Sequence, residues 1–161
     1  MVDDARERCS ERKRMRLAEV SYSSPETVYF ATLCARDKKD VFLHEGLAGV
    51  VVESLIWCRE NGRFRIYAYC LMPDHLHMAV SPYDYCPCLS DSIGAFKSHT
   101  TRESWRLGFS GQLWQRSWYD HIARRGEDIG AICAYILQNP VRKGLISEND
   151  EWPHSGMPDP L

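Results

Sequence analysis

The stretch that decides the fold is RFRIYAYCLMPDHLHMAVS, residues 63–81. Its first half alternates polar and apolar side chains as a strand does, a Pro-Asp pair interrupts it, and HLHMAVS predicts a second strand antiparallel to the first. Side chains at positions i and i+2 of a strand point to the same face. We therefore expect His75 and His77 on one face of the sheet, and Leu76 and Met78 on the other.

The flanking segments extend this pair of strands into a longer alternation. Strands are predicted at 28–36, 63–72, 75–81 and 112–123, and helices at 44–62, 89–108 and 127–140. The first six elements have the order of the split β-α-β, or ferredoxin-like, arrangement. The sequence thus predicts an α+β protein whose antiparallel sheet carries helices on one face. A C-terminal helix follows, and the other face of the sheet is free to build a site.

Helix boundaries can also be predicted from capping and helix-breaking residues. Ser90 or Asp91 is expected near the start of the second helix, because such side chains accept hydrogen bonds from the first turn. The third helix is expected to end near Pro140, which lacks a backbone N–H.

Length and composition favour one globular domain. The 161 residues suit a single hydrophobic core, with a basic arm expected at 1–20, the domain at 21–146 and a tail at 147–161. Neither a signal peptide nor a membrane span is evident, so the cytoplasm is the expected compartment. The seven cysteines are dispersed and odd in number, which favours reduced thiols over a disulfide framework.

The overall charge does not indicate nucleic-acid binding, but its distribution allows it. The net charge is −2, while six Lys and Arg residues lie between positions 6 and 16. Further cations, which could contact phosphates or simply be solvated, occur later in the chain: Lys97, Arg102, Arg116, Arg142 and Lys143.

Two pairs of residues have spacings that suit chemistry. His75 and His77 could form half of a metal site, or could be satisfied polar groups on a solvated sheet face. Tyr135 and Asn139 are four residues apart and share one helical face. The tyrosine is a potential nucleophile and the amide oxygen a potential ligand for a hard cation, although a packed tyrosine and a helix-ending Asn-Pro would look the same.

Three motifs together resemble a known family. YAYCLMPDHLHMAV, LWQRSWYDHIAR and YILQNPVRKGL occur in this order, and residues 28–146 are similar to the REP-associated tyrosine transposases. These are relatives of the single-tyrosine HUH transposases, so named for a histidine-hydrophobic-histidine motif. The resemblance implies a ferredoxin-like fold and an enzyme that acts on single-stranded or hairpin DNA, including genomic repeats.

The resemblance also implies roles for individual residues. His75, His77 and Asn139 would hold a divalent metal ion, Mg²⁺ or Mn²⁺, and Tyr135 would be the nucleophile. The implied reaction is metal-dependent cleavage and rejoining of one DNA strand through a 5′-phosphotyrosine intermediate. A monomer is expected from this branch of the family, with a dimer as the alternative.

Several alternatives remain at this stage. The protein could be a catalytically silent DNA-binding module, or a metal-dependent DNA hydrolase without a covalent intermediate. Trp114, Trp118 and Tyr119 could stack on unpaired bases or pack in the core. Cys86 and Cys88 resemble half of a zinc site, but no second Cys/His pair follows at a suitable spacing.

Overall fold

The computed structural model describes residues 24–85, 88–123 and 128–161. The predicted basic arm at 1–20 and Cys86 lie outside these ranges. The elements, in chain order, are β1 Tyr29–Cys34, η1 Arg36–Lys38, η2 Val41–Leu43, α2 Glu45–Glu60, β2 Phe64–Leu71, β3 His75–Pro82, α3 Leu89–Arg106, β4 Tyr119–Ile122, α4 Ile129–Leu137, α5 Asn139–Arg142 and β5 Ser155–Gly156. The predicted alternation of strands and helices is therefore confirmed, with two helical turns and a C-terminal strand in addition.

The strands form one five-stranded sheet in the order β4-β1-β3-β2-β5. Each neighbouring pair is antiparallel, and β3 lies at the centre. Leu76 of β3 is paired with Leu33 of β1 and with Leu71 of β2. The ferredoxin-like α+β fold expected from residues 63–81 is confirmed.

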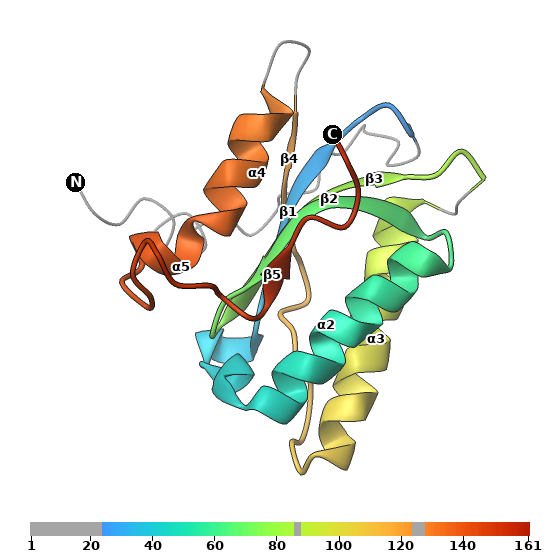
Figure 1. Cartoon of the computed structure of the whole chain (residues 1–161). Helices are drawn as coiled ribbons and strands as arrows, with labels where there is room; N and C mark the ends of the chain where they lie inside the picture. The colour runs from blue at the N-terminus through green and yellow to red at the C-terminus, as the bar shows by residue number, and fades with distance from the viewer. Residues whose placement is uncertain (1–23, 86–87, 124–127) are drawn as a thin grey trace.

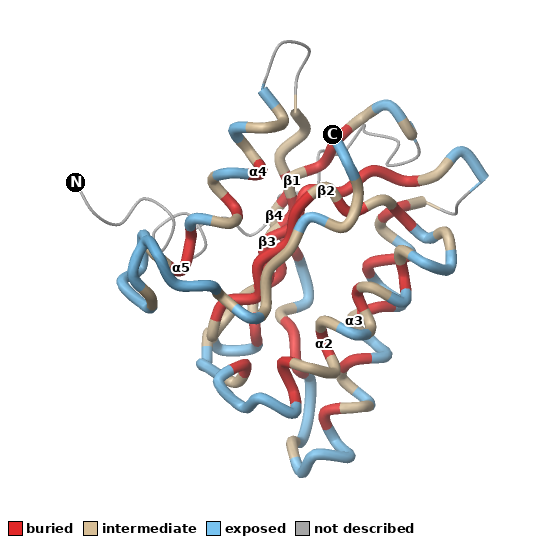
Figure 2. The backbone as a smooth tube through the Cα atoms, in the orientation of Figure 1, coloured by how far each residue is buried: buried red, intermediate tan, exposed pale blue. Residues whose placement is uncertain are grey.

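Helices cover both faces of this sheet, and they do so unequally. α2 and α3 pack together on one face, whereas α4 lies on the opposite face against β2 and β3 (Figure 1). Leu76 and Met78 are fully buried in the larger core under α2 and α3. Cys133 and Ile136 of α4 belong to a smaller core on the other face. The burial pattern in Figure 2 follows this division, with buried residues along the central strands.

The boundaries differ from expectation in two places. Only the end of the predicted 112–123 strand is a strand, because 112–118 is irregular and meets β1 through a single bridge between Ala35 and Trp114. Ser90 and Asp91 lie in the first turn of α3, as expected, and Cys88 occupies the N-cap position. The third helix stops at Leu137, and Pro140 lies in the first turn of α5, where a missing N–H is harmless.

The C-terminal residues are bound to the sheet, which the sequence did not predict. The Trp152 indole Nε1 donates to the carbonyl oxygen of Leu71 at 2.8 Å, and β5 then adds a short strand to the edge of β2. Farther on, Asp159 accepts two hydrogen bonds from the Arg59 guanidinium and one from the Ile66 backbone N–H. These contacts fasten the last residues of the chain along β2. No helix in the described ranges is long and apolar enough to cross a membrane.

Candidate active site

The two histidines begin β3 and share one face of the sheet, as the alternation predicts, and this face carries α4. His77 is 6% exposed and half-buried His75 lies closer to solvent. Their Nε2 atoms are 3.0 Å apart, and the ring planes are nearly perpendicular, at 77°. The two nitrogens therefore converge on one point at the end of the sheet.

The Nδ1 atom of each imidazole, on the side away from the other histidine, has a polar partner. His75 Nδ1 lies 2.5 Å from the Asp74 carboxylate, and His77 Nδ1 lies 2.8 Å from Thr32 Oγ1 on the neighbouring strand. Burial, with smaller contributions from His75 and Lys143, holds the pKa of His77 well below its ordinary value. His77 is thus a neutral imidazole, which is the protonation state that binds metal ions.

This arrangement fits a divalent cation. With metal–nitrogen bonds of about 2.1 Å, two nitrogens 3.0 Å apart subtend about 90°, which is the angle between neighbouring ligands of an octahedral ion. Hydrogen bonds to the outer nitrogens of metal-binding histidines are the usual support. Within the described residues no three His, Cys, Asp or Glu side chains gather around one point, and an amide oxygen is a further type of ligand that hard cations accept.

Helix α4 places Tyr135 next to this pair. The Tyr135 and His77 ring centroids are 6.4 Å apart. Phe30 packs beside both rings: it stacks on His77 at 5.4 Å and meets the Tyr135 ring edge-on at 6.1 Å. Tyr135 is half-buried, so its ring is packed while part of it reaches solvent.

Asn139 follows at the junction of α4 and α5. Its amide Nδ2 donates to the Tyr135 carbonyl oxygen at 3.0 Å, and the residue is 4% exposed. Because the amide nitrogen already donates a hydrogen bond within the protein, the amide oxygen is the atom left to coordinate a cation or accept a hydrogen bond. This contact ties the orientation of Asn139 to the last turn of α4.

Two cations follow α4 in the sequence and act on the tyrosine and histidine side chains. The Arg142 guanidinium carbon lies 4.4 Å from the centroid of the Tyr135 ring, which is a cation–π contact. Lys143 is one of the charges that lower the pKa of His77. Arg142 therefore lies against the Tyr135 ring, and Lys143 is near enough to His77 to act on its charge.

Phe30 and Thr32 were missed by sequence reasoning. They are two residues apart on β1 and share the face of His77, which is paired with Thr32 in the sheet register. The alternation of 28–36 could have placed them on one face. Only the pairing of β1 with β3, however, shows that this face is the one with the histidines.

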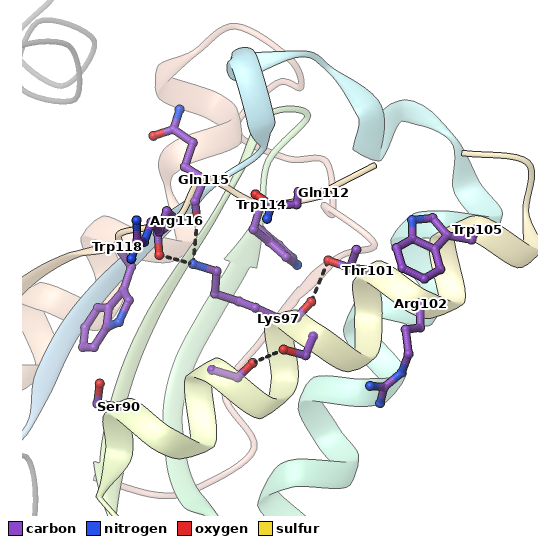
Figure 3. Close-up of a pocket in the computed structure, with 12 residues that line it drawn as sticks. Ser90, Lys97, Thr101, Arg102, Trp105, Gln112, Trp114, Gln115, Arg116 and Trp118 are labelled. Carbon is purple, nitrogen blue, oxygen red and sulfur yellow. Dashed lines mark hydrogen bonds between the residues drawn. The ribbon is translucent and has the colours of Figure 1, made fainter. Parts of the chain in front are cut away.

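The other predicted DNA-binding residues lie away from Tyr135, along a groove between α3 and residues 112–118 (Figure 3). Lys97 donates to the backbone carbonyl oxygens of Gln115 and Arg116, at 2.6 and 3.0 Å. It therefore fastens this irregular segment to α3. Arg102 and Arg116 are exposed at the groove.

The aromatic residues of this region divide between core and surface. Trp114 and Trp118 are 3% and 5% exposed, so of the two alternatives the structure supports core packing. Tyr119 begins β4 and is half-buried. Of these three residues, only Tyr119 keeps part of its ring at the surface.

Comparisons with known proteins find similar transposases. The family model for IS200-like transposases matches residues 24–139. A Haemophilus influenzae protein provisionally named a REP-associated tyrosine transposase is 25% identical over 81% of this chain and 79% of its own length. The REP-associated tyrosine transposase of Escherichia coli is 24% identical over 63% of this chain and 59% of its own.

A solved structure has the same fold. It is that of a REP-associated tyrosine transposase bound to a REP hairpin, and it superimposes with a TM-score of 0.69 at 22% identity. The match covers 83% of this chain and 78% of the other. The ferredoxin-like sheet and its helices are therefore shared with a DNA-bound member of this group.

Proposed function

This chain belongs to the IS200-like transposase family, and from that premise we propose that it cuts and rejoins single-stranded DNA through a covalent bond to Tyr135. In this proposal His75, His77 and Asn139 hold Mg²⁺ or Mn²⁺, and the substrate is single-stranded or hairpin DNA. The observation that carries the proposal is the convergence of two histidine Nε2 atoms, 3.0 Å apart, beside a tyrosine ring 6.4 Å from that of His77.

The chemistry follows from the groups at this site. When bound, a divalent ion would neutralise charge on the scissile phosphate. Tyr135 Oη attacks phosphorus and loses its proton, the bond from phosphorus to the 3′ oxygen breaks, and that oxygen takes up a proton. The products are a 5′-phosphotyrosine and a free 3′-hydroxyl. One phosphodiester bond replaces another, so attack by a 3′-hydroxyl on the phosphotyrosine reverses the step without ATP.

The remaining side chains position these groups. Thr32 and Asp74 fix the orientation of the imidazoles through their outer nitrogens, and Phe30 packs against both the His77 and Tyr135 rings. Arg142 and Lys143 supply positive charge where an anionic phosphate must enter. Arg142 in particular rests on the ring of the proposed nucleophile.

A denaturing-gel assay tests this proposal directly. Wild-type protein, labelled hairpin oligonucleotides with the repeats of the host genome and Mn²⁺ or Mg²⁺ should give a metal-dependent band of protein joined to DNA. Tyr135→Phe should abolish the band and leave DNA binding largely intact, and His75→Ala should also abolish it. Tyr85→Phe is the matched control, because Tyr85 is an exposed tyrosine beyond the other end of β3.

Other outcomes select the alternatives. A covalent band that persists in Tyr135→Phe rules out Tyr135 as the nucleophile. Cleavage that yields free 5′-phosphate ends without any band indicates a hydrolase in which water attacks. Tight binding without cleavage, across divalent metals and hairpin substrates, indicates a recognition module.

A further inference from the structure

The groove between α3 and residues 112–118 has the features of a binding surface. Its volume is about 530 Å³. Hydroxyl and amide groups line it together with the exposed guanidinium groups of Arg102 and Arg116 and the indole of Trp105 (Figure 3). Among the described residues, neither arginine forms a side-chain hydrogen bond or ion pair within the protein. The charge here is therefore available to an anionic ligand.

Trp105 is exposed and yet fixed in position. Its side chain lies near the end of α3 and is 51% exposed, while its Nε1 donates to the carbonyl oxygen of Gly111 at 2.7 Å. Gly111 has a φ of +75°, so the loop after α3 turns back towards the indole in a conformation that favours glycine. Since the indole N–H is already used, what remains for a ligand is the aromatic surface.

One wall of the groove is hydrogen-bonded to β1, the strand next to the histidines. Gln115 donates its backbone N–H to the carbonyl oxygen of Cys34, and Cys34 is the register partner of His75. Adjacent strands lie about 4.8 Å apart, so this wall of the groove is anchored one strand away from the candidate metal ligands. At the other end, the Arg36 guanidinium donates to the Gln112 side chain at 2.9 Å, close in sequence to the Gly111 that holds Trp105.

From these contacts we infer that the groove binds unpaired DNA adjoining the scissile phosphate, with Trp105 as a stacking surface for a base and Arg102 and Arg116 as phosphate contacts. The inference rests on the proposed function and adds a second contact region on the face of the sheet that α2 and α3 cover. Stacking on an aromatic face tolerates every base. The Trp105 contact therefore strengthens binding to single strands without selecting their sequence.

Paired tryptophan variants provide the test. Trp57 on α2 is 53% exposed and does not line the groove, so Trp57→Ala is a matched control for Trp105→Ala. The probe is a labelled oligothymidylate of about 16 nucleotides, with a blunt duplex of the same length as comparison. Trp105→Ala should weaken binding of the single strand about five- to hundredfold. Trp57→Ala should leave it unchanged, as should Trp105→Phe within about threefold.

A second measurement does not depend on how Trp105→Ala folds. Replacing Arg116 by Gln should reduce the slope of log affinity against log salt by about 0.7, the value for one lost phosphate contact on a single strand. Suppose that the wild type binds DNA and forms the Tyr135 adduct. Equal DNA affinities of Trp105→Ala and Trp57→Ala would then overturn this inference alone, and so would an unchanged salt slope in Arg116→Gln. Absence of both DNA binding and adduct in the wild type would overturn the proposed function as well.

Discussion

Replacing Thr32 by Val removes one hydroxyl behind the candidate metal site and keeps the shape of the side chain. Thr32 Oγ1 lies 2.8 Å from His77 Nδ1, and His77 is 6% exposed, so water has little access to replace the lost partner. Outer hydrogen bonds of this kind orient metal-binding imidazoles, and their loss typically weakens metal affinity about 10- to 100-fold. We expect a loss of that size in the Mn²⁺ affinity of Thr32→Val.

The same change should lower stability by a modest amount. A buried polar atom that loses its hydrogen bond costs about 1–3 kcal/mol, and this cost applies to His77 Nδ1 in the metal-free protein. Thr101→Val is the matched control. Its hydroxyl donates to the Lys97 carbonyl oxygen on α3, away from the histidines.

The assay is calorimetric titration of Mn²⁺ into each variant, together with chemical unfolding of the metal-free proteins. Thr101→Val should bind Mn²⁺ like the wild type. If Thr32→Val binds Mn²⁺ with unchanged affinity and is equally stable, the hydroxyl neither orients nor satisfies His77, and the reasoning is wrong. Absence of Mn²⁺ binding in the wild type would remove the metal site itself.

Three other predictions concern the tyrosine, the C-terminal contact and the core. Arg142→Ala should slow adduct formation about two- to thirtyfold in single-turnover assays, because a cation–π contact with Tyr135 contributes about 0.5–2 kcal/mol. Arg142→Lys should recover part of the rate. Equal rates in the wild type and both variants would contradict a positioning role. Asp159→Asn should lower the free energy of unfolding at neutral pH. Burial alone would raise the pKa of Asp159, but hydrogen bonds, chiefly from Arg59, lower it. The stabilisation by Asp159 is therefore present above the unfolded pKa of about 3.9 and is lost as pH falls through the folded value. Unfolding curves of the two proteins should therefore converge in acid, and a constant difference down to low pH would refute the assignment. Leu76→Ala should cost about 2–5 kcal/mol in urea unfolding, because Leu76 is fully buried under the helices; a loss below 1 kcal/mol would mean that β3 does not place Leu76 in that core.

Much of the fold could be predicted because its signals are local. Alternation in 63–81 predicts two strands, and it also divides His75 and His77 from Leu76 and Met78. The structure confirms this division, with both apolar side chains in the core under α2 and α3. A spacing of four residues predicts that Tyr135 and Asn139 share a helical face, and the hydrogen bond from Asn139 to the Tyr135 carbonyl oxygen links them directly.

Periodicity was less informative for residues 112–118. The run is aromatic, which favours a strand, but only 119–122 forms one. Lys97 donates hydrogen bonds to two carbonyl oxygens of this irregular segment. Trp114 is buried in the larger core, under α2 and α3. Neither contact has a signature in the local sequence, because Lys97 lies 18 and 19 positions before Gln115 and Arg116.

The sequence by itself determined which side chains share a face, since strand and helix periods depend only on neighbouring residues. Tertiary structure alone decided which faces meet. The pairing of β1 with β3 brings Thr32 and Phe30 to His77, and the packing of α4 on β2 and β3 brings Tyr135 to the histidines. Arg59 and Asp159 are 100 positions apart in the chain. Such contacts depend on the closure of long loops and the burial of distant apolar surfaces, which no local pattern encodes.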